Sequence, residues 1–146
     1  MCLLSIDKRA SKRKIGYKVF HKKGKSYYTG LTSEAYRTKF KLGEWVSDPV
    51  KSQGYTYTEF GKFFDKFGVA IATKIVRGFS VCFYKSDAFG VLQQLRNWPA
   101  YDNPCNDLVV CKVETDGTFC SGLTNWAADF HPKTIVVNKC RIICEV

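Results

Sequence analysis

The clearest repeat of apolar residues along the chain has the period of an α-helix. Its positions are spaced i, i+3, i+4 and i+7, and they are Ala88, Val91, Leu92 and Leu95. Ser86 is a suitable N-cap residue, Asp87 falls in the first turn, and Trp98-Pro99 ends the pattern. The spacing therefore predicts one principal helix with a single apolar face that must be buried.

The same period occurs a second time in an aromatic stretch, residues 51–68. The repeating residues are Phe60, Phe63, Phe64 and Phe67. Glycines at 54, 61 and 68 divide this stretch, so it is either a short helix or an ordered loop. An apolar face packed on a sheet explains the spacing better than a platform for base stacking does.

Most of the remaining apolar residues are β-branched or aromatic and lie in short runs, which is typical of strands. The predicted strands are 15–20, 26–29, 69–76, 79–84, 108–114 continuing into 118–120, and 134–146. Turns are expected at 21–25, at Arg77-Gly78 and at Asp116-Gly117, so that neighbouring runs form hairpins. The prediction is an α+β fold, a mainly antiparallel sheet with one principal helix packed on it.

Length and composition favour one globular domain. The chain has 146 residues, 45% of them hydrophobic and 25% charged, which suits a single core over residues 1–146. Residues 1–14 are either part of that domain or a flexible basic arm. No apolar run reaches the roughly 18 residues that span a bilayer, and the N-terminal residues lack a signal-peptide pattern. We expect a cytoplasmic protein without a transmembrane segment.

The seven cysteines support a reducing compartment. An odd number without regular spacing does not form a disulfide framework, and several cysteines lie in apolar strand sequence. Cys111 alternates with Val109 and Val113, and Cys140 shares a predicted strand face with Cys144. We expect reduced thiols packed in the core, with disulfides of a secreted form as the alternative.

Charge is the strongest indication of function. The formal net charge is +10, and residues 1–45 hold twelve Lys or Arg against three acids, so nearly all the excess lies there. Cations interleaved with tyrosines attract phosphates and offer rings on which bases stack. The predicted ligand-binding residues are Lys12, Arg13, Lys14, Lys22, Lys23, Lys25, Tyr27, Tyr28 and Arg37, within a basic region that extends to Lys39 and Lys41. The alternatives are a solvated basic surface and tyrosines whose rings belong to the core.

Sequence motifs for catalysis or metal binding are weak. His21 and His131 are the only histidines, and no paired cysteine spacing, phosphate-binding glycine loop or nucleophile elbow occurs. We therefore predict no catalytic residue, no metal and no cofactor. An ADP-ribosyltransferase-like site built from Arg77, Ser80 and Glu145 is a rival interpretation, although the sequence lacks that site's usual Ser-Thr-Ser and Glu-x-Glu motifs.

Several short motifs resemble a loose family of short, uncharacterised proteins that are encoded by tailed phages and other viruses. They are Met1-Cys2-Leu3, Tyr17-Lys18-Val19, Gly43-x-Trp45, Gly78-Phe79-Ser80-Val81 before Asp87-Ala88, Val109-Val110-Cys111-Lys112-Val113 and Thr134-Ile135-Val136-Val137. The chain departs from the family at Ser80, where histidine is usual. The resemblance implies a viral accessory protein of an infected cell.

The charge pattern and the resemblance lead to three candidate functions, of which the first is preferred. The first is a protein that binds an anionic partner, nucleic acid or nucleotide, and counteracts host defence. The second is a structural or protein-interaction module, such as a virion component or an inhibitor of an acidic protein. The third is an enzyme that acts on a nucleotide.

Overall fold

A computed structural model describes residues 2–29, 38–47, 54–57, 74–97, 108–124, 126–127 and 129–146. The predicted phenylalanine repeat of residues 60–67 lies outside these ranges, as do Arg37, Trp98 and Pro99. The elements, in chain order, are β1 (Cys2–Ile6), β2 (Ile15–Lys23), β3 (Ser26–Tyr28), β4 (Lys39–Lys41), β5 (Val46–Ser47), β6 (Gly54–Tyr57), β7 (Lys74–Arg77), β8 (Phe79–Cys82), α2 (Lys85–Arg96), β9 (Leu108–Thr124) and β10 (Lys133–Glu145).

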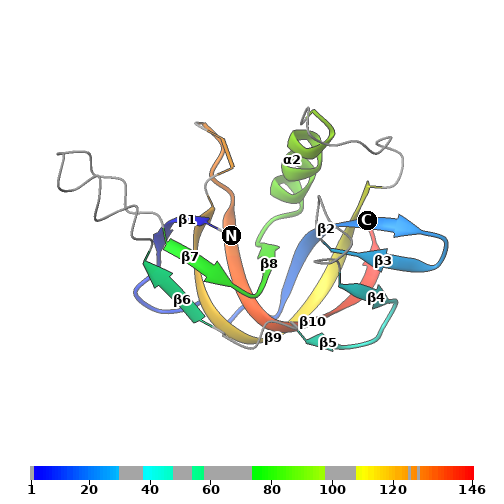
Figure 1. Cartoon of the computed structure of the whole chain (residues 1–146), viewed down its shortest axis with the longest axis horizontal. Coiled ribbons are helices and arrows are strands. Elements are labelled where there is room, and N and C mark those ends of the chain that lie inside the picture. The colour runs from blue at the N-terminus through cyan, green and yellow to red at the C-terminus, as the bar shows by residue number, and fades with distance from the viewer. Residues whose placement is uncertain are drawn as a thin grey trace.

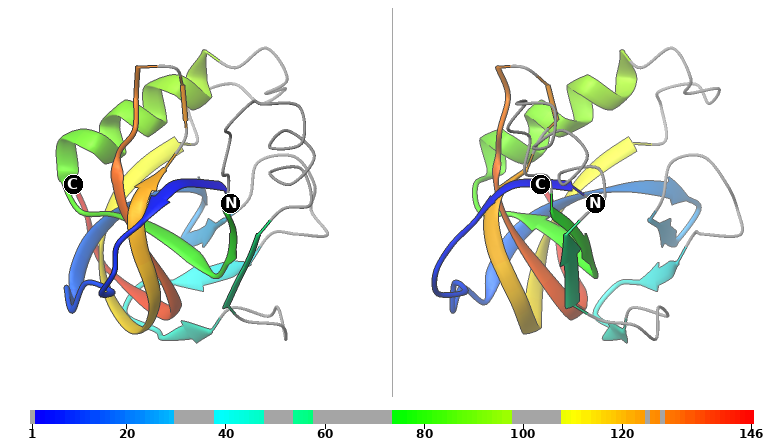
Figure 2. Two further views of the ribbon diagram at one scale, coloured as in Figure 1. Left: turned by 90° about the vertical axis from the view of Figure 1, so that its left-hand side faces the viewer. Right: turned by 60° about the vertical axis from the view of Figure 1, so that its left-hand side comes forward.

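The strands form one antiparallel sheet that closes on itself as a barrel (Figures 1 and 2). Strand β2 pairs with β9 from Ile15 to His21, and it also meets β8 at the pair Tyr17 and Cys82. Strands β8 and β9 both pair with β10, so the ring β2–β8–β10–β9 is complete. Gly16 allows this closure, because a Cβ atom there would lie 2.3 Å from Val81 Cγ1 and 2.7 Å from the Cys82 carbonyl oxygen.

Two long strands form the wall of the barrel. Strands β9 and β10 have 17 and 13 residues, and they stay paired along most of their length while they curve beneath the other strands (Figure 1). At roughly 3.3 Å per residue, β9 would extend about 56 Å if straight, so it must coil to stay within a small domain. A bulge in β9 between Thr118 and Cys120, opposite Val136 and Val137 of β10, and Gly117 with a φ of +67° in β9 supply the bend.

The sheet separates two groups of buried side chains. The interior group contains aromatic and branched residues from β2, β3, β4, β8, β9 and β10. The second group lies between the outer side of the sheet and α2, where Ala88, Val91, Leu92 and Leu95 of the helix are buried as predicted. The fold is thus mostly antiparallel sheet, with one helix among the described residues.

Four local predictions are wrong. Residues 54–57 form strand β6, within a stretch that the sequence predicts to be a short helix or an ordered loop. Strands β7 and β8 exist but do not pair, since β7 pairs with β1 and β6 while β8 pairs with β2 and β10. Asp116-Gly117 does not reverse the chain, because β9 continues through it beside β10. The helix N-cap is Tyr84, which makes no side-chain capping hydrogen bond, and Ser86 lies inside the first turn.

Four of the described cysteines occupy buried positions, as expected. Cys82, Cys111, Cys120 and Cys140 are buried and unbonded to one another, and Cys144 is exposed although it was expected to share the face of Cys140. A register shift between Ile142 and Cys144 turns the end of β10 and explains that exposure. Within the described ranges, no helix combines the length and apolar character that crossing a membrane requires.

Candidate functional site

The basic part of the sequence forms a three-stranded projection from the barrel wall, β2–β3–β4 (Figure 1). Gly24 has a φ of +60° and is followed by Lys25, so the β2–β3 connection is a two-residue turn with glycine at its first central position. This turn pairs Lys23 with Ser26, and Ser26 in turn pairs with Lys41. The next row pairs His21 with Tyr28 and Tyr28 with Lys39.

Directly paired residues of an antiparallel sheet point to the same side, and so do alternate residues of one strand. The outward side of the projection therefore carries the buried His21 and exposed lysines around Tyr28, with a further lysine at the turn. We call this surface the lysine face, and its members are Lys23, Lys25, Tyr28, Lys39 and Lys41. All four lysines are exposed, and Tyr28 is half-buried.

The opposite side of the same strands is apolar and anchors the projection. Phe20, Tyr27 and Phe40 are buried there, with the ring centroids of Phe20 and Phe40 5.1 Å apart. Phe40 also contacts Phe79 of β8 at 5.3 Å between centroids. Because these rings hold β3 and β4 against the interior, the lysine face has a rigid support.

The lysine face is strongly positive. Strands β2, β3 and β4 contain no acidic residue, and among the described residues none of Lys23, Lys25, Lys39 and Lys41 has an ion-pair partner. Lys23 and Lys41 are two strands apart, roughly 10 Å, and Lys39 and Lys41 are roughly 7 Å apart along one strand. Like charges at such spacings repel by roughly 0.4–0.6 kcal/mol per pair in water, so an anion that bridges them would be stabilised.

Two predicted ligand residues point away from this face. Lys22 and Tyr27 lie on the interior side, where the Lys22 Nζ atom is 2.6 Å from Glu145 Oε1 and the Tyr27 hydroxyl donates to the same oxygen at 2.8 Å. The ring of Tyr27 is 6% exposed, so it is unavailable for stacking. Their position follows from the turn at Gly24-Lys25, which is two residues long and not the predicted five.

Three further predicted residues lie at the other end of β2. Lys12, Arg13 and Lys14 precede Ile15, roughly 26 Å from Lys23 along an extended strand. The Arg13 guanidinium lies over the rings of Phe83 and Tyr84 at 5.3 and 5.6 Å, and Lys14 forms a 3.7 Å ion pair with Asp116. The structure thus divides the predicted basic region into two separate groups.

The three residues of the rival ADP-ribosyltransferase-like site come from β7, β8 and β10. Ser80 pairs with Val136 near the start of β10, whereas Glu145 is the last residue of that strand. Arg77 belongs to β7, which does not pair with either β8 or β10. Glu145 is also held by Lys22 and Tyr27, which gives it a structural role.

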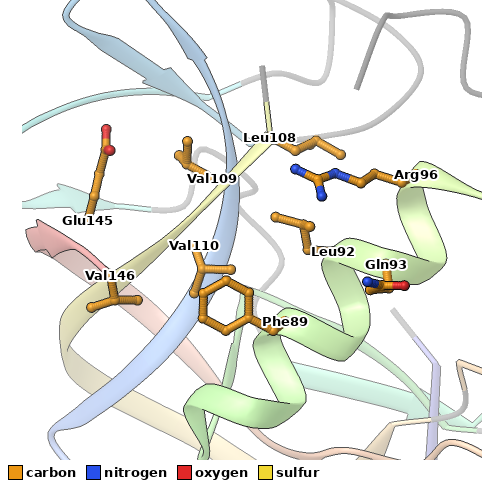
Figure 3. A pocket seen from close by; sticks show the side chains of 9 residues that line it. All are labelled: Phe89, Leu92, Gln93, Arg96, Leu108, Val109, Val110, Glu145 and Val146. Atoms are coloured by element: carbon orange, nitrogen blue, oxygen red, sulfur yellow. The ribbon is translucent and has the colours of Figure 1, made fainter. Parts of the chain in front are cut away.

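A groove runs between α2 and the start of β9 (Figure 3). Phe89 and Leu92 form its helix side, Val110 and Val146 face them, and Arg96 lies at the rim (Figure 3). Its volume of about 240 Å³ is below the range of about 300–1,000 Å³ usual for small-molecule sites. The groove is therefore a poor candidate for a nucleotide pocket, and an extended surface such as the lysine face is the better one.

Sequence reasoning missed one cluster of the outer wall. Trp45, Lys139 and Arg141 gather where β5 pairs with β10, and we call this group the Trp45 cluster. No signal in the sequence joins a tryptophan at position 45 to cations more than ninety residues later, because their proximity depends on barrel closure.

Comparison with protein-family models, with curated proteins and with solved structures finds no match for this chain.

Proposed function

We propose that this protein binds nucleic acid through the lysine face. The observation that carries the proposal is the presence of four exposed lysines on one side of β2–β3–β4, with no acidic residue in these strands. A row of cations on a flat, rigid surface suits the repeated negative charges of a phosphate backbone better than a single small anion. Binding of this kind is largely independent of base sequence, because contacts to phosphates carry no sequence information.

A test compares two fourfold variants of equal charge. One replaces Lys23, Lys25, Lys39 and Lys41 with glutamine, and the other replaces Lys12, Lys14, Lys85 and Lys133, which lie away from the lysine face. Each lowers the net charge of +10 by four. Affinity for a fluorescent oligonucleotide is measured by anisotropy at a low and a moderate salt concentration, with circular dichroism as the check of folding.

We expect the lysine-face variant to lose most of its binding, and its salt dependence to fall by about 0.7–0.9 per phosphate contact removed. The matched variant should retain most of its affinity. Equal losses in both variants would mean that net charge alone attracts the oligonucleotide, which would contradict the proposal. An absence of binding by the natural protein would also contradict it, and would favour an acidic protein as the partner.

The viral resemblance of the sequence agrees with this function without testing it. A small basic protein made in an infected cell would meet viral and host nucleic acid at high concentration. Protection of viral nucleic acid, or occupation of a surface that host defence proteins use, would follow from the same binding, and both stay predictions.

A further inference from the structure

We propose that the nucleic acid is single-stranded and that one of its bases stacks on Trp45, next to the lysine face. The inference rests on the proposed function and names its substrate class. It draws on an independent feature, the Trp45 cluster.

Trp45 is an exposed aromatic residue on the outer wall. Its relative exposure is 43%, and the next residue, Val46, pairs with Cys140 of β10. This register sets Trp45 beside Arg141, whose guanidinium lies 5.1 Å from the ring centroid, and the Lys139 Nζ atom lies 5.8 Å from it. A large ring left partly in water has no evident role in the core, because the buried interior group does not include it.

The Trp45 cluster continues the lysine face. Lys41, the last residue of β4, is joined to Glu44 by a turn in which the Glu44 amide donates to the Lys41 carbonyl oxygen at 3.1 Å. Gly43 within this turn has a φ of +80° and donates its amide to the Ile142 carbonyl oxygen at 2.9 Å. The turn is therefore fixed to β10, and Trp45 follows it directly on the outer side of the wall.

The cations of the Trp45 cluster are positioned by acids and add little net charge. The Arg141 Nε atom donates to Glu114 Oε2 at 2.8 Å, and Lys139 forms a 3.4 Å ion pair with Asp116. These pairs hold the two cations against the ring, where cation–π contact fixes its orientation. The contribution of Trp45 to binding is consequently aromatic, whereas that of the lysine face is electrostatic.

This division of roles distinguishes a single strand from a duplex. Bases in a duplex are stacked on one another and do not present a free face, whereas unpaired bases stack on exposed aromatic rings in proteins that bind single strands. Such proteins combine cations that contact phosphates with aromatic rings that stack on bases. The lysine face and Trp45 would supply these two kinds of contact.

The experiment uses three ligands of equal length and the full chain. They are a single-stranded thymidine oligonucleotide, an abasic sugar-phosphate oligomer and a duplex. The variants are Trp45→Leu, Trp45→Phe and, as a control that removes an exposed ring from α2, Phe89→Leu. Trp45→Leu should weaken thymidine binding by about 5- to 150-fold, the range of one base–aromatic stack, and should leave abasic binding unchanged. Trp45→Phe should retain part of the affinity, and Phe89→Leu all of it.

Intrinsic fluorescence supplies a second measurement that does not depend on the stability of Trp45→Leu. Thymidine binding should quench part of the tryptophan emission of the natural protein, and that part should be missing in Trp45→Phe. If Trp45→Leu binds thymidine as tightly as the natural protein does, or loses abasic binding to the same extent, the stacking inference is wrong. Equal affinity of the natural protein for the duplex would also overturn it. In each of these cases, the comparison of the lysine-face variant with its matched variant still tests the proposed function independently.

Discussion

The hydroxyl group of Tyr27 donates a 2.8 Å hydrogen bond to the Glu145 carboxylate and thereby ties β3 to the end of β10. Lys22 approaches the same carboxylate oxygen at 2.6 Å. The hydrogen bonds from Lys22 and then Tyr27 lower the pKa of Glu145. Burial, aided by Glu145, raises the pKa of Tyr27 from 10.0 to about 12. The hydrogen bond thus favours the protonated phenol of Tyr27 and the ionised carboxylate of Glu145.

Tyr27 should therefore ionise at a higher pH than an ordinary tyrosine. Because its pKa in the folded protein lies above the usual value of 10.0, the stability that depends on the neutral phenol is complete below pH 10 and is lost as the pH rises towards 12. Tyrosinate absorbance should contain a step at high pH that is missing in Tyr27→Phe and present in Tyr84→Phe, which removes the hydroxyl group of an exposed tyrosine. A step at high pH that survives in Tyr27→Phe would assign it to another tyrosine.

Closure of the barrel depends on Gly16. Any side chain there would meet Val81 Cγ1 and the Cys82 backbone, and the backbone cannot move aside without breaking the contact between β2 and β8. Gly16→Ala should lower the free energy of unfolding by about 1–3 kcal/mol or more, measured by urea denaturation. Gly90→Ala is the matched control. A Cβ atom at position 90 meets the far end of the Phe130 ring, which can rotate away, and alanine favours the helix by up to about 1 kcal/mol. Similar losses in both variants would contradict this role of Gly16.

Local patterns predict the helix and the longer strands, but they miss β1, β4, β5 and β6 and do not identify which strands pair. The helical period found α2, and β-branched runs found β2, β3, β8 and β10. The pairing of β7 and β8 was mispredicted because both strands find distant partners, β1 and β6 for one and β2 and β10 for the other. A short link such as Gly78 can turn a chain from one part of a barrel wall to another as easily as it can form a hairpin.

The candidate site was predicted in part for a similar reason. A five-residue turn at 21–25 leaves the orientation of Lys22 and Lys23 open, whereas the two-residue turn at Gly24-Lys25 fixes it. One residue of register then decides which lysine faces outward and which one binds Glu145. Trp45 meets Arg141 only because β5 docks on β10, a contact between segments nearly one hundred residues apart.

The thiols should differ sharply in reactivity. Burial raises the pKa of Cys82, Cys111 and Cys140 to about 12, and Cys120 is also buried, whereas Cys144 is exposed. At about pH 8 a thiol of pKa 12 is ionised in roughly one molecule in ten thousand. Brief treatment with iodoacetamide should therefore modify Cys144 well before these four, as mapped by peptide mass spectrometry. The same treatment in urea should modify all five, and equal rates in the folded protein would contradict the burial of the other four.

Burial of Phe40 should hold β4, and with it Lys39 and Lys41 of the lysine face, against the core. Strand β4 has only three residues, and Phe40, which is 0% exposed, is its contact with the interior rings of Phe20 and Phe79. Phe40→Ala should cost about 3–5 kcal/mol of unfolding free energy, as large-to-small core changes do, whereas Leu42→Ala, at a residue 58% exposed, should cost under about 0.5 kcal/mol. Urea denaturation measures both. Because Lys39 and Lys41 flank Phe40 and point the opposite way, partial loss of this anchor should also weaken oligonucleotide binding in molecules that stay folded. A Phe40→Ala protein with unchanged stability would mean that β4 is not held by the core and that the lysine face lacks the rigid support described above.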